Sequence, residues 1–203
     1  MSQLQIRLFG GFQVHLNEQP IRFPTQKVRA LFAYLSVEAK SAHPREKLMT
    51  LFWPEQSQNS ASNNLRQTLS RLRAVLPADT LLIRDNEIQF NPQSEMNLDV
   101  AHFLSLIETK SRHTQTVAFD DPGWLRQAEA AASLYRGDFL AHFAVADCAE
   151  FEEWVLLKRE WLRRCVNDLF FQCARVLTGL YNFDQALYYT WRQIELDTLN
   201  EEA

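Results

Sequence analysis

The sequence predicts a mainly α-helical fold with small β elements, arranged as two successive domains. Three observations predict it. Strand-like alternation of apolar and polar residues is confined to the first twenty-odd residues and to residues 81–90. Helical periodicity dominates the chain after residue 24. The charge also changes sign, because residues 1–93 hold 11 basic and 7 acidic side chains whereas the remainder holds 10 and 18.

The composition is that of a globular protein. Among 203 residues, 46% are hydrophobic and 12% aromatic, and only 5 Gly and 7 Pro are present. The apolar runs are too short to cross a bilayer, and no signal-peptide pattern precedes residue 4. Three cysteines without a C-x-x-C pair indicate neither a disulfide framework nor a zinc site. We therefore expect a cytoplasmic protein with no membrane contact.

The N-terminal alternation predicts an antiparallel meander of about three strands. Leu4 to Leu8 alternate, and so do Phe12 to Leu16, with Gly10-Gly11 between them as a two-residue hairpin signal. A second turn then leads to a short strand at 21–23.

Three helices and a second hairpin follow the meander. Pro24 lies at or just before the start of the first helix, and Pro44 opens a short second helix that stops at Trp53-Pro54. The third helix spans 59–76 and ends before Pro77. The hairpin occupies 81–90 and has a polar tip. This order predicts a winged helix-turn-helix, in which the second helix of the pair enters the major groove of DNA and the hairpin forms the wing.

The third helix has two contrasting faces. Its apolar stripe is formed by Leu65, Leu69, Leu72 and Leu76, and the other side carries no carboxylate. Amide and guanidinium groups bind base edges bidentately, and Arg also neutralises phosphate. If the helix stood alone, this side could simply be a polar face in contact with water. The elements around it follow the order of a winged helix, and this order favours DNA binding. The outward side chains are Asn63, Gln67, Ser70 and Arg71, flanked by Arg66 and Arg73.

The remainder of the chain predicts paired helices. A short amphipathic segment covers 98–108, a polar loop follows at 110–116, and Asp121-Pro122 caps a helix that runs to about Tyr135. A long helix then extends to Gly179, and Asn182 starts another. Paired helices with small residues at the crossing and large aromatics beside them predict a tetratricopeptide-like repeat domain.

Three further features of this helical half are predicted: a helix cap, an inter-repeat turn and the burial of aromatic side chains. Asp147 and Glu150 have capping-box spacing at the start of the long helix. Residues 196–203 are typical of an inter-repeat turn followed by a new helix, so we expect the chain to be the front fragment of a longer protein. Most of the large aromatics are expected to lie in the core. These are Trp154, Trp161, Phe170, Phe171 and Trp191.

Several motifs together resemble one known family, the antibiotic-regulatory-protein type of bacterial transcriptional regulator. The resemblance covers nearly the whole chain. Thr198 stands where that family usually has Pro, and residues 110–119 match nothing in it. The matching segments are Phe9–Phe12, Thr25–Leu31, Leu51–Pro54, Asn64–Arg73 and Leu196–Ala203.

The resemblance implies an OmpR-like winged-helix domain over 1–93 and a bacterial transcriptional activation domain, tetratricopeptide-like, over 94–203. It also implies that Asn63 and Gln67 read adenine edges, and that Arg71 reads guanine or contacts a phosphate. The implied partners are double-stranded promoter DNA with repeated sites, RNA polymerase, a second copy on DNA, and later domains of the same longer chain.

Residues outside the third helix complete the predicted DNA-binding surface. Thr25, Lys27 and Arg45 lie at helix starts, where free backbone N–H groups also favour phosphate. Arg84 and Asn86 lie at the wing tip, beside acidic neighbours that oppose a tight grip. The full predicted set is Asn63, Asn64, Arg66, Gln67, Ser70, Arg71, Arg73, Thr25, Lys27, Arg45, Arg84 and Asn86.

Enzyme activity finds no support in the sequence. Phosphate-binding and nucleophile-elbow motifs are absent, and the five histidines are scattered without metal-ligand spacing. We therefore expect no catalytic residue, cofactor or metal within these residues. The alternative to a DNA-binding regulator is a protein-interaction adaptor whose winged helix no longer binds DNA.

Overall fold

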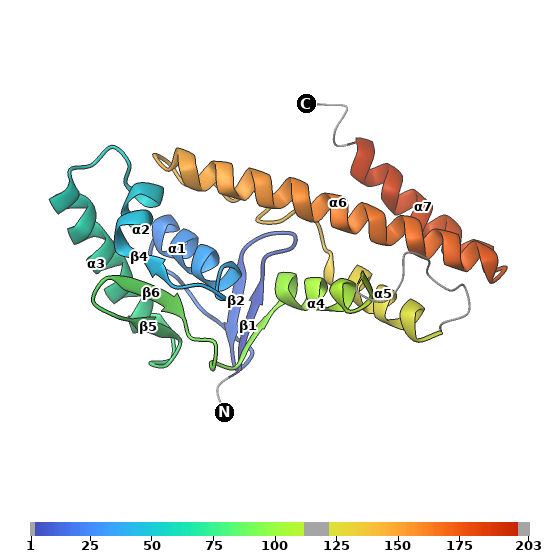
Figure 1. Ribbon diagram of the computed structural model, residues 1–203, viewed down its shortest axis with the longest axis horizontal. Coiled ribbons are helices and arrows are strands. Elements are labelled where there is room, and N and C mark those ends of the chain that lie inside the picture. The colour runs from blue at the N-terminus through green and yellow to red at the C-terminus, as the bar shows by residue number, and fades with distance from the viewer. Residues whose placement is uncertain (1–2, 112–121, 199–203) are drawn as a thin grey trace.

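The computed structural model describes residues 3–111 and 122–198, and it is an elongated molecule with the winged helix at one end (Figure 1). The strands are β1 (Leu4–Arg7), β2 (Gln13–Leu16), β3 (Gln19–Pro20), β4 (His43–Pro44), β5 (Leu81–Ile83), β6 (Glu87–Phe90) and β7 (Met96–Leu98). The helices are α1 (Gln26–Val37), α2 (Arg45–Phe52), α3 (Gln58–Val75), α4 (Asp99–Ser111), α5 (Pro122–Leu134), α6 (Ala149–Gly179) and α7 (Phe183–Thr198).

The N-terminal strands form a four-stranded sheet in the order β3-β2-β1-β7. β1 pairs antiparallel with β2, placing Ile6 opposite Val14, and parallel with β7, placing Ile6 opposite Leu98. The sequence did not predict β7. Because it follows the predicted boundary at residue 93, the sheet includes residues from both sides of that boundary, and the division into domains stays a prediction.

Two predictions about the meander are wrong. The third strand is β3 rather than 21–23, because Phe23 turns into the core and packs on the Phe32 ring at 5.2 Å. Gly10-Gly11 does not form a two-residue turn, since the last pair is Arg7 with Gln13 and residues 8–12 form a longer loop. Gly10 has φ +78°, and a Cβ there would lie 2.8 Å from the carbonyl oxygen of Arg136. Only glycine fits this close contact.

The predicted three helices and wing hairpin are confirmed. Thr25 caps α1, with its side chain accepting a hydrogen bond from the Val28 N–H. The third helix begins at Gln58, slightly earlier than predicted, because the Ser57 side chain accepts from the Ser60 N–H and caps it. β5 and β6 form the antiparallel wing, and the short β4 adds a third strand in the order β4-β6-β5.

The second half is helical, as predicted, and its helices pack each on the next in chain order. α6 contains 31 residues, so it spans about 46 Å at 1.5 Å per residue. The predicted capping box at its start is wrong. Cys148 is the N-cap and makes no side-chain capping bond, because Asp147 takes a left-handed conformation with φ 56°.

Other predictions for the helical half are corrected or lie outside the described residues. α4 continues to Ser111, so the predicted loop at 110–116 starts later, and Asp121 and most of that loop are not described. α7 continues through Thr198, so residues 196–198 are helical rather than a turn, while 199–203 are not described. No helix within 3–111 and 122–198 combines the length and apolarity needed to cross a bilayer.

The prediction that most large aromatics are core is wrong. Phe170 is fully buried and Trp154 is partly buried. In contrast, Trp161, Phe171 and Trp191 are 44%, 56% and 59% exposed. Helical spacing alone does not identify the buried face here, because α6 and α7 carry large apolar residues on both faces.

α6 packs against the winged helix through aromatic rings. The ring of Phe151 lies 5.2 Å from that of Phe52 at the end of α2, and the indole of Trp154 lies 5.0 Å from the ring of Tyr34 in α1. These contacts belong to one hydrophobic cluster that extends through both halves of the chain. The orientation of the winged helix relative to α6 is therefore set by a packed core.

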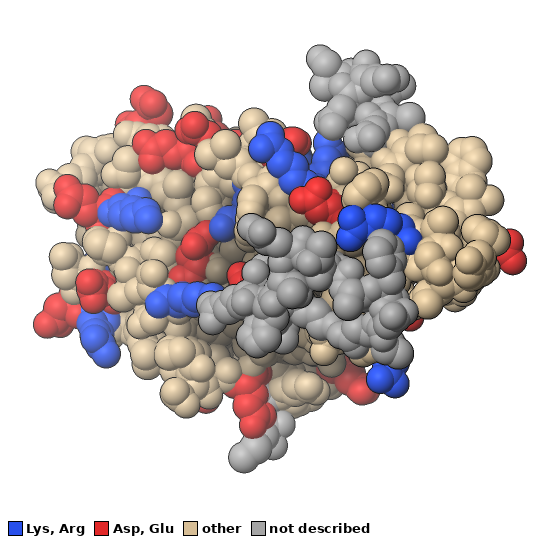
Figure 2. Space-filling model, turned by 45° about the vertical axis from the view of Figure 1, so that its right-hand side comes forward, with Lys and Arg blue, Asp and Glu red and all other residues tan. Residues whose placement is uncertain are grey.

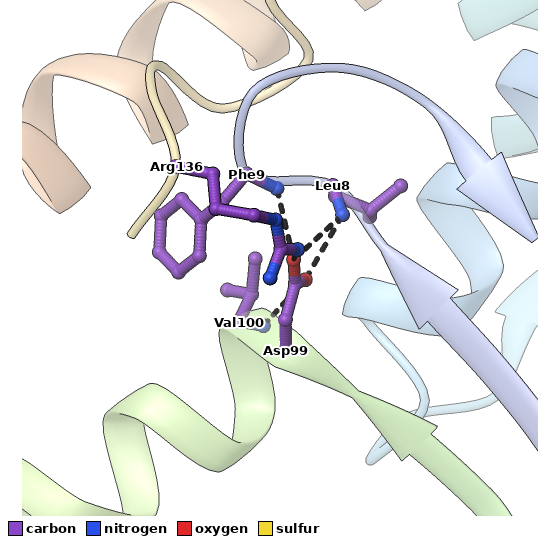
Figure 3. A network of polar contacts seen from close by, with 5 residues as sticks. All are labelled: Leu8, Phe9, Asp99, Val100 and Arg136. Carbon is purple, nitrogen blue, oxygen red and sulfur yellow. Dashed lines mark hydrogen bonds and ion pairs between the residues drawn. The ribbon is translucent and has the colours of Figure 1, made fainter. Parts of the chain in front are cut away.

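The Asp99 carboxylate joins three segments that are distant in sequence (Figure 3). It accepts hydrogen bonds from the backbone N–H groups of Leu8 at 2.9 Å, Phe9 at 3.1 Å and Val100 at 2.8 Å. It also pairs with the Arg136 guanidinium at 2.7 Å, although its own side chain is only 4% exposed. Burial raises the pKa of Asp99, and the hydrogen bonds and Arg136 oppose that rise. We call this arrangement the Asp99 cluster.

We expect Asp99→Ala to lower the free energy of unfolding by about 3 kcal/mol, because it leaves buried N–H donors and Arg136 without their acceptor. Urea titration followed by circular dichroism measures the change. The matched control is Glu108→Ala on the exposed side of the same helix, which should change stability by less than about 0.5 kcal/mol. Equal stability of the two variants would contradict the role assigned to Asp99.

Glu38, which follows α1, connects it to α6. Its carboxylate lies 2.9 Å from the Lys158 ammonium and accepts a hydrogen bond from the Trp154 indole N–H at 3.1 Å. Burial raises the pKa of Glu38, but Lys158 and Trp154 outweigh that effect and lower it below the ordinary 4.5. A lowered native pKa means that ionised Glu38 stabilises the fold above the unfolded pKa, and that this stabilisation disappears as the pH falls through the native value.

We expect Glu38→Gln to reduce stability at pH 7 by about 1 kcal/mol, with the difference from the parent shrinking as the pH falls below about 4. Thermal melts across this pH range measure it. The exposed Glu46→Gln provides the control and should show no such dependence. A difference that stays constant down to acid pH would show that the Glu38 charge plays no part.

Candidate nucleic-acid interface

The outer face of α3 is exposed and has no carboxylate. Asn63, Gln67, Ser70 and Arg71 all point to solvent, while Leu65 and Leu72 on the opposite side are 1% and 0% exposed. Within the described part of the chain, neither the Gln67 side chain nor the Arg71 side chain has a hydrogen bond or an ion pair. Both side chains can therefore bind a ligand without first breaking an internal contact.

A groove beside this face brings together predicted residues from α2 and α3. It is lined by Arg45 at the start of α2, by Arg66, Ser70 and Arg73 on α3, and by Leu69 and Ile83, with a volume of about 300 Å³. Three guanidinium groups thus border one groove beside α3, β5 and the start of α2. The sequence did not predict its apolar lining by Leu69 and Ile83, because the side chain of Ile83 comes from a different element, β5.

Two asparagines on α3 are held by neighbouring side chains. The Asn64 side-chain amide donates to Gln56 in the turn between α2 and α3, so Asn64 positions the start of α3 and is half-buried. The Asn63 side-chain oxygen accepts from Arg66 at 3.2 Å and remains exposed. Of the two, Asn63 is the one whose place suits contact with a base.

The wing tip lies against the start of α2. The Arg45 side chain donates to the Asp85 carbonyl at 3.0 Å, and its backbone N–H donates to the Asn86 carbonyl at 2.9 Å. Arg84 and Asn86 are exposed at this tip, next to the exposed Asp85. Arg45 therefore fixes the position of the wing in addition to lining the groove.

Thr25 and Lys27 have internal roles and do not line the groove. Thr25 caps α1. The Lys27 ammonium donates to the Phe52 carbonyl at 3.0 Å and lies 5.6 Å from the centre of the Trp53 ring. The same carbonyl accepts from the Cys148 thiol at 3.3 Å, so Lys27 lies where α2 meets α6. Burial raises the pKa of Cys148, which keeps its thiol protonated.

α3 packs against α1 and α2, and α4 to α7 leave its outer face uncovered (Figure 1). α3 and the wing lie at one end of the long axis, and α7 lies toward the other. Among the described residues no cluster of three or more His, Cys, Asp or Glu side chains could hold a metal ion. The arrangement offers hydrogen-bond donors and positive charge on an accessible surface.

The comparison with solved structures identifies this architecture. Mycobacterium tuberculosis EmbR, solved in complex with a low-affinity phosphopeptide, matches with a TM-score of 0.66 at 17% sequence identity. The chain has the EmbR fold. The match covers 97% of this chain and 57% of the EmbR chain, so this chain spans little more than half of the EmbR length.

The EmbR match confirms the predicted fold, with a winged helix followed by a helical region, over nearly the whole chain. No model of a protein family matches the chain, and no curated protein matches it. The predicted DNA-binding residues stay predictions, since a shared fold does not show what a surface binds.

Proposed function

We propose that this chain is a sequence-specific DNA-binding transcriptional regulator. In this proposal α3 lies in the major groove, and the helical half contacts a second copy, RNA polymerase or other domains. The observation that supports it best is the accessible, carboxylate-free face of α3 beside a groove bordered by three arginines. Such a surface combines base-reading amides with phosphate-neutralising cations.

The residues divide into two expected roles. Asn63, Gln67 and Arg71 occupy the exposed centre of α3 and are proposed to contact base edges. Arg45, Arg66 and Arg73 border the groove toward the wing and are proposed to hold the DNA backbone. Thr25 and Lys27, which the sequence also favoured, are left out of the proposed contacts because Thr25 caps α1 and the Lys27 ammonium donates to the Phe52 carbonyl.

A protein-interaction adaptor is the second candidate, and the exposed apolar surface where α6 meets α7 favours it. The right-hand end of the molecule in Figure 2 is almost free of charged side chains. Large exposed apolar residues on α6 and α7 often mark protein contacts. They include Phe171, Leu180, Tyr181, Phe183, Leu187, Tyr188, Trp191 and Ile194.

Salt dependence of binding distinguishes the two candidates. A DNA-binding protein that neutralises phosphates with Arg45, Arg66 and Arg73 should lose affinity with a slope of log K against log salt of about −2.7, at about −0.9 per phosphate. Fluorescence anisotropy with mixed duplexes, followed by selection from random duplexes, measures the slope and the site. An adaptor would show no DNA binding even at low salt, which would refute the proposed function.

We expect Arg71→Ala to lower affinity for the selected site by about 1–3 kcal/mol and to relax preference at one base position. Arg73→Ala is the matched variant. It should weaken binding equally on all sequences and reduce the salt slope by about 1, because it removes a backbone contact. Gel-shift titration on the selected site and on single-base variants separates the two effects. Equal losses for Arg71→Ala on every sequence would make Arg71 a backbone contact instead.

A further inference from the structure

A second cleft lies where the winged-helix sheet, α6 and α7 meet, well away from α3. It has a volume of about 590 Å³, within the range of small-molecule sites. Its lining combines the Gly10 loop with the segment that follows α5 and with side chains from α6 and α7. The charged and polar side chains include Arg136, His142, Arg159, Arg192 and Glu195.

All three arginines are held in place, and Arg136 and Arg159 retain free donors. Arg136 pairs with Asp99 through Nη2, and its side chain is 40% exposed. Arg159 donates Nε to the Phe139 carbonyl at 3.0 Å and Nη2 to the Leu140 carbonyl at 3.1 Å. Among the described residues, no group accepts a hydrogen bond from Nε or Nη1 of Arg136, or from Nη1 of Arg159. Fixed guanidinium groups with open donors bind oxyanions without further ordering.

Arg192 adds a third positive group on α7. Its Nη2 donates to the Tyr135 carbonyl at 3.0 Å, and its guanidinium lies 4.4 Å from the Phe170 ring centre. This stacking fixes the plane of the group, which lines the cleft together with the other two arginines.

The nearby carboxylates offset part of this positive charge. Asp99 pairs with Arg136, and Asp138 pairs with Arg163, each at 2.7 Å, so neither offsets Arg159 or Arg192. Asp138 also accepts from the Tyr135 hydroxyl at 3.0 Å. Glu195 is the remaining carboxylate among the described lining residues and would compete with a bound anion.

The backbone is strained at two positions in and beside the cleft lining. Leu140 and His142 take left-handed conformations, with φ 49° and 57°. Such conformations cost free energy in residues other than glycine and often mark functional sites. The Gly10 N–H also donates to the Gly137 carbonyl at 3.1 Å, which closes one side of the cleft.

From this geometry we propose that the cleft binds a small organic oxyanion, a phosphate or carboxylate. Arg136 and Arg159 contact its oxygens, and Arg192 adds a third positive charge. The site is separate from the DNA-binding face, so the proposal stands or falls independently of the proposed function.

Glycine signals in the whole chain provide the test. The protein contains five glycines, and with ¹⁵N-glycine labelling each backbone N–H gives a signal of its own. Gly10, Gly11 and Gly137 lie at or beside the cleft, whereas Gly123 and Gly179 lie elsewhere and serve as internal controls. The probes are phenyl phosphate, benzoate and inorganic phosphate, each titrated without DNA to about 10 mM. The first two arms distinguish a phosphate from a carboxylate ligand.

We expect saturable shifts of Gly10, Gly11 and Gly137 with at least one organic probe, while Gly123 and Gly179 stay unchanged. Arg136→Lys preserves the charge next to Asp99 but removes planar donors, and should weaken binding by about tenfold. Glu195→Gln removes the competing charge and should strengthen binding by about two- to fivefold. These opposite effects cannot both result from lost folding, and thermal melts of each variant check that it is folded.

Three outcomes would overturn the proposal. The first is the absence of saturable shifts at the three cleft glycines with every probe. The second is shifts of equal size at Gly123 and Gly179, which would indicate non-specific anion binding. The third is an affinity that neither Arg136→Lys nor Glu195→Gln changes.

Discussion

The Asp99 carboxylate is the contact on which the relation between the two halves of the chain depends. Asp99 lies at the first turn of α4. Its carboxylate accepts hydrogen bonds from the backbone N–H groups of Leu8 and Phe9, the two residues that follow β1. It also holds Arg136, from the segment after α5. Since a buried carboxylate needs several donors, each of these segments is positioned by the same group. The close approach of Gly10 to Arg136 follows from this arrangement.

α6 connects this arrangement to the winged helix. Its first turns pack Phe151 and Trp154 against α2 and α1, and its far end packs against α7. α6 therefore contacts both the helix-turn-helix and α7. Lys27 and Cys148 both donate to the Phe52 carbonyl, so these two side chains link the end of α2 to the starts of α1 and α6.

Patterns that are local in sequence predicted much of this structure. The leucine stripe and the carboxylate-free face of α3, the wing hairpin and the long helix ending at Gly179 all depend on residues within one or two turns of each other. The resemblance on Asn64–Arg73 fits the same order of elements, and the EmbR fold confirms that order. The exposure of Asn63, Gln67 and Arg71 also agrees with the sequence pattern.

What the amino-acid sequence alone determined is the identity and order of the elements and the chemistry of the α3 face, because side-chain periodicity and capping act over a few residues. Only the tertiary structure determined which side chains are exposed and which have partners elsewhere in the chain. It placed β7 beside β1, gave Asp99 its four partners, brought the Lys27 ammonium to the Phe52 carbonyl, and left Trp161 and Trp191 exposed. Each of these depends on groups far apart in the chain, whose meeting is set by packing and by the need to satisfy buried polar atoms.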